Sequence, residues 1–138
     1  MEAANRGAFE AGGISIGINI ELSEGQRMNS YVNRPIGFYY FFTRKVMLSF
    51  SSDVYVFFPG GFGTLDEFFE MVTLVQTKKL KKDVPIIVVK KEYWEPLFKW
   101  LELEVYLKYK AITKENLKIF QIVDSAQEAM EIIEKRKK

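Results

Sequence analysis

One short run constrains the fold of this chain more than any other: residues 59–67, Pro-Gly-Gly-Phe-Gly-Thr-Leu-Asp-Glu. The apolar residues 53–58 precede it, and an amphipathic stretch over residues 65–80 follows it. A strand, a glycine-rich turn and a helix in this order make an anion-binding site, because glycine lets the backbone approach a ligand and the first N–H groups of the helix point at it. The run therefore predicts a phosphate site. Glu67 is unexpected there, since a carboxylate repels a phosphate unless it serves another part of the ligand.

The same run also has a purely structural interpretation. Thr64 and Glu67 fit the capping-box pattern, in which Glu67 only accepts a hydrogen bond from a backbone N–H. Gly60, Gly61 and Gly63 can serve tight packing alone. The run is neither a Walker A loop, which needs Gly-Lys-Ser/Thr, nor the dinucleotide-binding fingerprint. On these residues by themselves, structure and chemistry remain equal alternatives.

Strands and helices alternate along the rest of the chain. Periodicity predicts strands at residues 14–20, 36–42, 53–58, 84–89 and 119–123, and helices at residues 1–11, 43–50, 64–80, 93–108 and from 125 onward. The continuous apolar run at 84–89 is typical of a strand buried on both faces. This order predicts an α/β fold with a mostly parallel, doubly wound sheet and helices on both faces. In such folds ligands bind beyond the carboxyl ends of the strands, where the 59–64 turn lies.

Composition limits the chemistry and the partners. The chain has 138 residues, 48% of them hydrophobic, which predicts a single domain over residues 1–138. It has no cysteine and no histidine, so acid–base chemistry must use Asp, Glu, Lys, Tyr or Arg. A net charge of +2, concentrated at residues 78–82 and 135–138, gives no argument for nucleic acid, because lysines suit helix ends. Without a membrane-length apolar run or a signal peptide, we expect a cytoplasmic protein and no membrane partner.

Arg44 and Lys45 lie in the helix predicted just before the strand that leads into the glycine turn. Arginine offers a planar fork that suits phosphate or carboxylate, although Arg44 judged alone is more simply explained as a surface charge. Together with residues 59–67, this pair resembles the RK…PGGxGTxxE signature of the LOG family. These proteins are nucleoside 5′-monophosphate phosphoribohydrolases that release cytokinin bases and have long carried the label "lysine decarboxylase". Residues 1–8 (MEAANRGA) and 93–97 (YWEPL) also resemble segments of this family.

The resemblance covers nearly the whole chain and implies a Rossmann-like, nucleotide-binding domain in a homodimer or larger homo-oligomer, with a site shared across the subunit interface. Family members carry a strand, a helix and a second strand before the segment that begins here at Met1. The chain is therefore expected to be N-terminally truncated relative to the family. An internal methionine taken as the start, a shortened gene product, or a partner chain that fills the gap would each explain the difference.

The resemblance also implies residue roles for hydrolysis of a nucleoside 5′-monophosphate, such as adenosine 5′-monophosphate, to free base and ribose 5-phosphate. Gly60, Gly61, Gly63 and Thr64 would hold the phosphate, Arg44 and Glu67 would be the catalytic pair, Lys45 would belong to the same pocket, and Glu2 and Asn5 would line the base or ribose side. Glu67 would stabilise the oxocarbenium-like transition state or activate the attacking water.

Two other functions are alternatives to hydrolysis. A nucleotide-binding carrier or sensor would use the same phosphate turn without catalysis. A decarboxylase would need pyridoxal phosphate on a lysine, but no lysine has a recognisable context and no histidine is present to stack on that cofactor. The predicted reaction needs neither a cofactor nor a metal.

Overall fold

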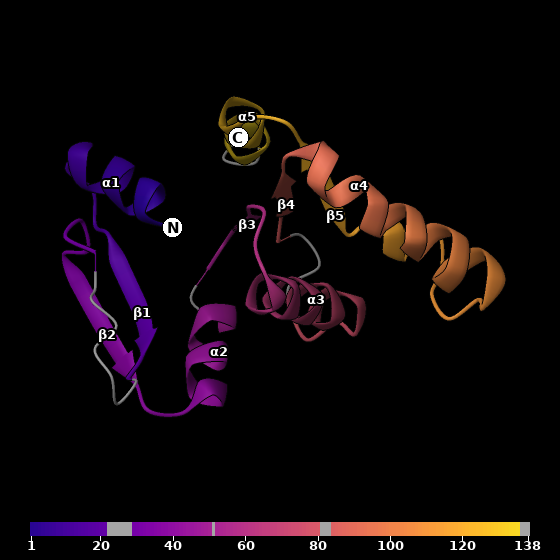
Figure 1. Cartoon of the computed structure of the whole chain (residues 1–138), viewed down its shortest axis with the longest axis horizontal. Coiled ribbons are helices and arrows are strands. Elements are labelled where there is room, and N and C mark those ends of the chain that lie inside the picture. Colours follow the sequence, from indigo (N-terminus) through magenta and orange to yellow (C-terminus); the bar gives the residue numbers. More distant parts are fainter. Residues whose placement is uncertain (22–28, 51, 81–83, 136–138) are drawn as a thin grey trace. The chain divides into compact units, whose positions relative to one another are not determined.

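The computed structural model describes residues 1–21, 29–50, 52–80 and 84–135, and Figure 1 gives the order of the elements. The chain divides into two compact units, Met1–Ser51 and Ser52–Lys138, and each contains its own sheet. All strands of the described residues pair in parallel, and helices alternate with them. The predicted α/β, Rossmann-like fold class is therefore confirmed. The single domain over residues 1–138 stays a prediction. Of the two positively charged segments, 78–82 and 135–138, residues 81–82 and 136–138 lie outside the described residues.

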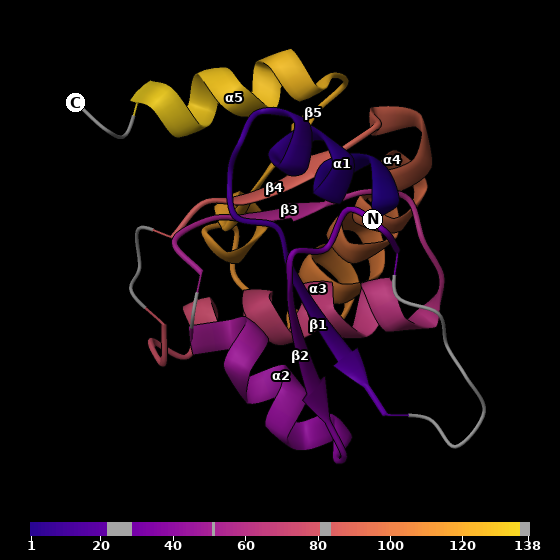
Figure 2. The ribbon, with the colours of Figure 1, turned by 90° about the vertical axis from the view of Figure 1, so that its left-hand side faces the viewer.

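The first unit contains helix α1 (Glu2–Glu10), strands β1 (Ile16–Ile20) and β2 (Arg34–Phe38), and helix α2 (Phe41–Phe50). The two strands run side by side in the same direction, as Figure 2 shows. The strand predicted at 36–42 ends earlier, and α2 begins earlier than residue 43. The reason is that the carbonyl of Tyr40 accepts the N–H of Arg44 and the hydroxyl of Thr43, which starts a helical turn despite the aromatic, strand-like composition.

The second unit contains one three-stranded sheet and the helices around it. Its elements are β3 (Tyr55–Phe57), α3 (Phe62–Gln76), β4 (Ile86–Val89), α4 (Lys91–Trp100), the π-helix η1 (Leu101–Lys108), the 3-10 turn η2 (Asn116–Lys118), β5 (Phe120–Val123) and α5 (Ala126–Lys135). The strand order is β3-β4-β5. The predicted helix over 93–108 thus begins two residues earlier and changes to π-helix at Leu101.

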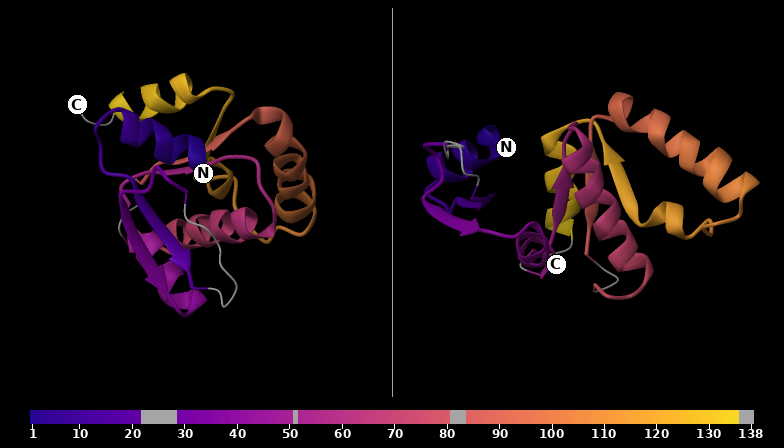
Figure 3. Two further views of the ribbon diagram at one scale, coloured as in Figure 1. Left: turned by 60° about the vertical axis from the view of Figure 1, so that its left-hand side comes forward. Right: turned by 60° about the horizontal axis from the view of Figure 1, so that its bottom comes forward.

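Strand β4 is the centre of this unit and is buried along its whole length. Ile86 and Val88 pack into the hydrophobic cluster formed with α3 and α4, whereas Ile87 and Val89 pack with α5. Figures 2 and 3 show α3 and α5 on opposite sides of the β3–β4 strands. The prediction of a strand covered on both faces is confirmed for β4.

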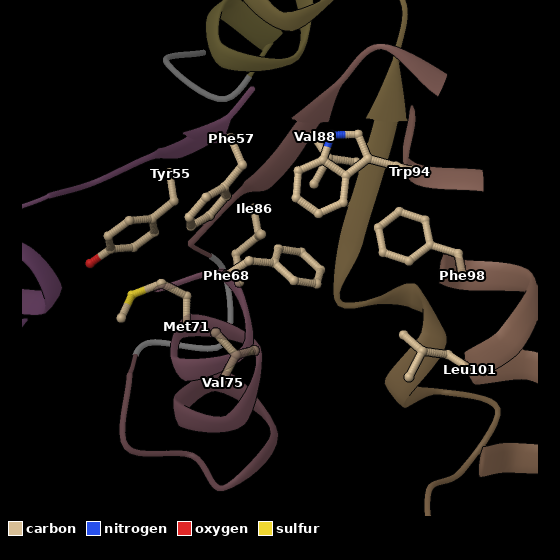
Figure 4. Close-up of a cluster of buried hydrophobic side chains, with 10 residues drawn as sticks. All are labelled: Tyr55, Phe57, Phe68, Met71, Val75, Ile86, Val88, Trp94, Phe98 and Leu101. Carbon is tan, nitrogen blue, oxygen red and sulfur yellow. The ribbon is translucent and has the colours of Figure 1, made fainter. Parts of the chain in front are cut away.

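Phe68 of α3 is the hub of the larger cluster, which Figure 4 shows, and its side chain is fully buried. Its ring centroid lies 5.2 Å from that of Trp94, 5.4 Å from that of Phe120 and 5.6 Å from that of Phe57. Tilted and edge-to-face rings at these distances stabilise a core beyond the area that they bury. Phe68 therefore joins α3, α4 and two strands at one point.

One helix end confirms a finer prediction: residues 125–128 (Ser-Ala-Gln-Glu) predict a capping box at the start of the last helix. The Ser125 hydroxyl accepts the N–H of Glu128 at 3.2 Å, which is the expected cap of α5.

Among the helices of the described residues, none is long and apolar enough to cross a lipid bilayer.

We expect Phe68→Ala to lower the free energy of unfolding by about 3–5 kcal/mol, because truncation leaves a cavity among rings that cannot collapse into it. Phe62→Ala is the matched control: Phe62 is 92% exposed, and its loss should change stability by no more than about 0.5 kcal/mol. Urea unfolding followed by circular dichroism measures both variants. Equal midpoints for the two variants would contradict the hub role of Phe68.

Candidate functional site

The glycine turn joins the carboxyl end of β3 to the first residue of α3. Gly61 is the N-cap of α3, and its carbonyl accepts the N–H of Leu65 at 3.2 Å. The N–H groups of Phe62, Gly63 and Thr64 come before that first helical hydrogen bond. Within the described residues, these three groups have no protein acceptor. They are the donors that an anion would use.

The capping-box interpretation of Thr64 and Glu67 is wrong. The extended backbone of Gly61 (φ −92°, ψ −156°) starts the helix earlier, so Thr64 is already its third residue and cannot be the cap. Glu67 lies one turn beyond Gly63 and Thr64, and residues three and four apart share one face of a helix. Gly63 has no side chain, so nothing of its own fills the space between the turn and Glu67 on that face.

Packing explains only one of the three glycines. A Cβ atom on Gly60 would lie 2.1 Å from Oγ1 of Thr64, so the Thr64 side chain excludes any other residue there. A Cβ on Gly61 or Gly63 would meet nothing within 4 Å. Glycine inside a helix costs roughly 1 kcal/mol relative to alanine. Packing within the described chain therefore does not explain the glycine at position 63. The remaining explanation is that the absence of a side chain lets a ligand reach the backbone there.

The other two helices that begin at this edge of the sheet each have one N-terminal N–H bonded to a protein side chain. The N–H of Lys91 in α4 donates to Oδ1 of Asp124 at 2.9 Å, and the start of α5 uses Ser125. Among the described helices of this unit that follow a strand, only α3 shows no hydrogen bond from its first N–H groups to a side chain. This difference favours α3 as the anion site.

Tyr93 contacts the turn, and the sequence reasoning missed it as a site residue. Its hydroxyl donates a hydrogen bond to the carbonyl of Gly60 at 2.5 Å. The sequence predicted only that residues 93–97 belong to a helix that resembles one of the family's helices. The signal that could have found Tyr93 is its place just after β4, because β3 and β4 are parallel neighbours and end at the same edge.

Arg44 and Lys45 lie on α2 in the first unit. Nε of Arg44 donates to the carbonyl of Ile18 at 3.3 Å, which holds the guanidinium beside β1. The backbone carbonyl of Lys45 accepts the hydroxyl of Ser49 at 2.8 Å. The Arg44 contact joins α2 to β1 within the first unit, whereas the Ser49 contact lies within α2 itself.

Glu2 and Asn5 lie on α1 in the same unit. The Asn5 amide group donates to Oγ of Ser15 at 3.0 Å and accepts from Nδ2 of Asn29 at 3.0 Å. Asn5 therefore connects α1 to the segment before β1, which is a structural role. Glu2 is exposed in the first turn of α1, where a carboxylate favours the helix dipole. Their contact with a base or ribose stays a prediction.

The predicted site residues thus fall into two groups. The second unit holds Gly60, Gly61, Gly63, Thr64 and Glu67 within one turn and the start of one helix. The first unit holds Glu2, Asn5, Arg44 and Lys45. The catalytic pairing of Arg44 with Glu67 stays a prediction. In the part of the chain that the structure describes, no group of three or more Asp and Glu side chains is arranged to hold a metal ion.

Fold and turn together define a class: a Rossmann-like α/β protein with a candidate phosphate-binding turn at the carboxyl edge of its parallel strands. The sequence profile of a family described as "Possible lysine decarboxylase" matches residues 1–133. The chain belongs to this family, which is the LOG family that residues 44–45 and 59–67 predicted. No curated protein matches the chain.

Two alanine substitutions separate packing from ligand access at the turn. We expect Gly60→Ala to lower the free energy of unfolding by about 1–3 kcal/mol, because Thr64 must move to admit the new Cβ. Gly63→Ala should leave it unchanged or raise it by up to about 1 kcal/mol. Thermal unfolding of the ligand-free protein measures both. Destabilisation by Gly63→Ala equal to that by Gly60→Ala would mean that packing requires glycine at both positions.

Proposed function

We propose that this protein hydrolyses the N-glycosidic bond of a nucleoside 5′-monophosphate to free base and ribose 5-phosphate. The observation that carries the proposal is the open start of α3, where Gly61 and Gly63 expose the backbone and Glu67 follows on the same face. Membership of the family supports it, because the signature of that family contains these residues.

The phosphate would bind to the N–H groups of Phe62, Gly63 and Thr64, with the Thr64 hydroxyl as a further donor. The helix dipole contributes about 0.3–1 kcal/mol toward an anion at an exposed helix start, and each hydrogen bond to a charged group about 1.5–3 kcal/mol. This binding energy is remote from the reacting bond and would position the ribose for attack.

Hydrolysis breaks the bond between C1′ of the ribose and the base nitrogen, and a water oxygen forms the new bond to C1′. Positive charge develops on the ribose in the transition state, and the Glu67 carboxylate would stabilise it or accept a proton from the water. The base leaves with a proton. Arg44 would orient the substrate or stabilise the departing base, and Lys45 would contribute positive charge to the same pocket.

Substrate recognition would extend to Glu2 and Asn5 on the base or ribose side. We further propose a homodimer or larger homo-oligomer in which the site is shared between subunits. Adenosine 5′-monophosphate is the first substrate to test, and a cytokinin nucleotide is the second.

The family description names a different reaction, the decarboxylation of lysine, which depends on pyridoxal phosphate held as a Schiff base by a lysine. The residues of the phosphate turn do not fit that cofactor. Residues 58–67 contain no lysine, and the chain has no histidine to stack on a pyridine ring. We therefore assign no step of the reaction to this cofactor.

Glu67→Gln keeps the size of the side chain and removes its charge, so we expect the rate of base release from adenosine 5′-monophosphate to fall roughly 10²–10⁴-fold. Glu102→Gln, an exposed change on η1, is the control and should keep the wild-type rate. Chromatographic measurement of adenine and ribose 5-phosphate checks both. Full activity of Glu67→Gln would remove Glu67 from the mechanism. Tight nucleotide binding by the wild type without turnover would instead favour the carrier or sensor.

Arg44→Lys keeps the positive charge but loses the planar fork, so we expect kcat/KM to fall about tenfold or more. Arg34→Lys on β2 is the matched control, because Arg34 is exposed at the start of its strand. Steady-state kinetics with the same substrate compares the two. A wild-type kcat/KM for Arg44→Lys would show that charge alone is needed at position 44.

A further inference from the structure

We propose that Tyr93 is a positioning residue of the phosphate-binding turn. Its hydroxyl holds the peptide between Gly60 and Gly61, so that the backbone entering α3 keeps one direction and the N–H groups of Phe62, Gly63 and Thr64 stay aimed at the bound phosphate. The inference rests on the proposed function in one respect, namely that the ligand of the turn is a phosphate group.

The hydrogen bond itself carries the first step. The Tyr93 hydroxyl donates to the carbonyl oxygen of Gly60 at 2.5 Å, at the short end of the range for such bonds. The peptide is trans and planar, so the Gly61 N–H points opposite to the Gly60 carbonyl. Fixing the carbonyl therefore fixes the plane of the peptide that leads into Gly61, the N-cap of α3. Two consecutive glycines have more conformational freedom than any other pair, which makes an external restraint effective.

A second side chain lies close to the same residue. Oγ1 of Thr64 lies so close to Gly60 that an added Cβ would be 2.1 Å away. Gly60 thus lies close to a side chain of α3 and accepts a hydrogen bond from a side chain of α4. A turn restrained in this way loses less conformational entropy when a ligand binds. Because this entropy loss opposes binding, the restraint raises the affinity for the ligand.

The position of Tyr93 is itself fixed by its neighbour Trp94. Trp94 is fully buried, donates its indole N–H to the carbonyl of Val89 at 3.1 Å, and packs against Phe68 of α3, as Figure 4 shows. The rings of Tyr93 and Trp94 meet edge to face at 5.2 Å. Helices α3 and α4 are therefore joined through the core below the turn, and the Tyr93 hydroxyl joins them again at the turn.

Tyr93→Phe removes only the hydroxyl and tests the proposal. We expect the Kd for inorganic phosphate and the KM for adenosine 5′-monophosphate to rise roughly three- to tenfold, the effect of one ordinary hydrogen bond. The kcat and the unfolding midpoint should stay within about twofold and about 2 °C of the wild type, because the hydroxyl touches neither the ribose nor the core. Tyr109→Phe is the matched control, since Tyr109 is 70% exposed at the end of η1.

The readouts separate positioning from general damage and from failure of the proposed function. The ¹⁵N-HSQC signal of Gly61 should shift in Tyr93→Phe, whereas signals of the α5 residues should not. Weaker phosphate binding by Tyr93→Phe supports the proposal even if the wild type releases no base, in which case hydrolysis alone is wrong. Unchanged Kd and KM in Tyr93→Phe would overturn the positioning role while hydrolysis stands. A wild type that binds no phosphate would overturn both.

Discussion

The burial of Phe68 is the interaction on which the second unit depends. Its ring lies against side chains of β3, β5 and α4 at once, so it fixes α3 near the middle of that helix. A helix held at its middle has its first turn determined as well, because the rise per residue is constant. The start of α3 is thus placed at the carboxyl edge of the sheet by a residue that no ligand touches. The ring contacts of Phe68 therefore stabilise the core and also position the candidate phosphate-binding turn.

The helices that follow the parallel strands differ in how the N–H groups at their first turns are hydrogen-bonded. Three helices of this unit begin at the same edge, and each brings unsatisfied N–H groups to it. Asp124 occupies the start of α4, and Ser125 and Glu128 occupy the start of α5. The start of α3 instead carries Gly61 as its cap and Gly63 inside the helix, where glycine is destabilising and fills no space. Residues that weaken the fold without a packing reason are typical of a binding site.

Features set by local sequence were predictable, and features set by tertiary contact were not. The apolar run of β4, the Ser125 cap and the glycine turn each have a local cause that the sequence shows. The start of α3 was misplaced because Thr64 and Glu67 match a capping box, while the turn makes Gly61 the cap instead. Tyr93 was missed because its bond to Gly60 joins residues 33 positions apart and exists only when β3 and β4 are neighbours.

The position of Glu67 along α3 resolves the conflict between a carboxylate and a phosphate site. Glu67 is five residues beyond Phe62, so its Cα lies about 7.5 Å along the helix axis from the first residue. Helical side chains lean toward the N-terminus, so the Glu67 carboxylate would lie on the side of its Cα that faces the turn, one helical turn from the N–H groups that would hold the anion. A ribose bound by its 5′-phosphate would extend from the turn along this face. The ribose becomes cationic in the transition state, with the phosphate at one end and the Glu67 carboxylate at the other. Both anionic groups would stabilise that positive charge. A carboxylate that is unfavourable next to the phosphate would therefore be favourable at the far end of the ribose.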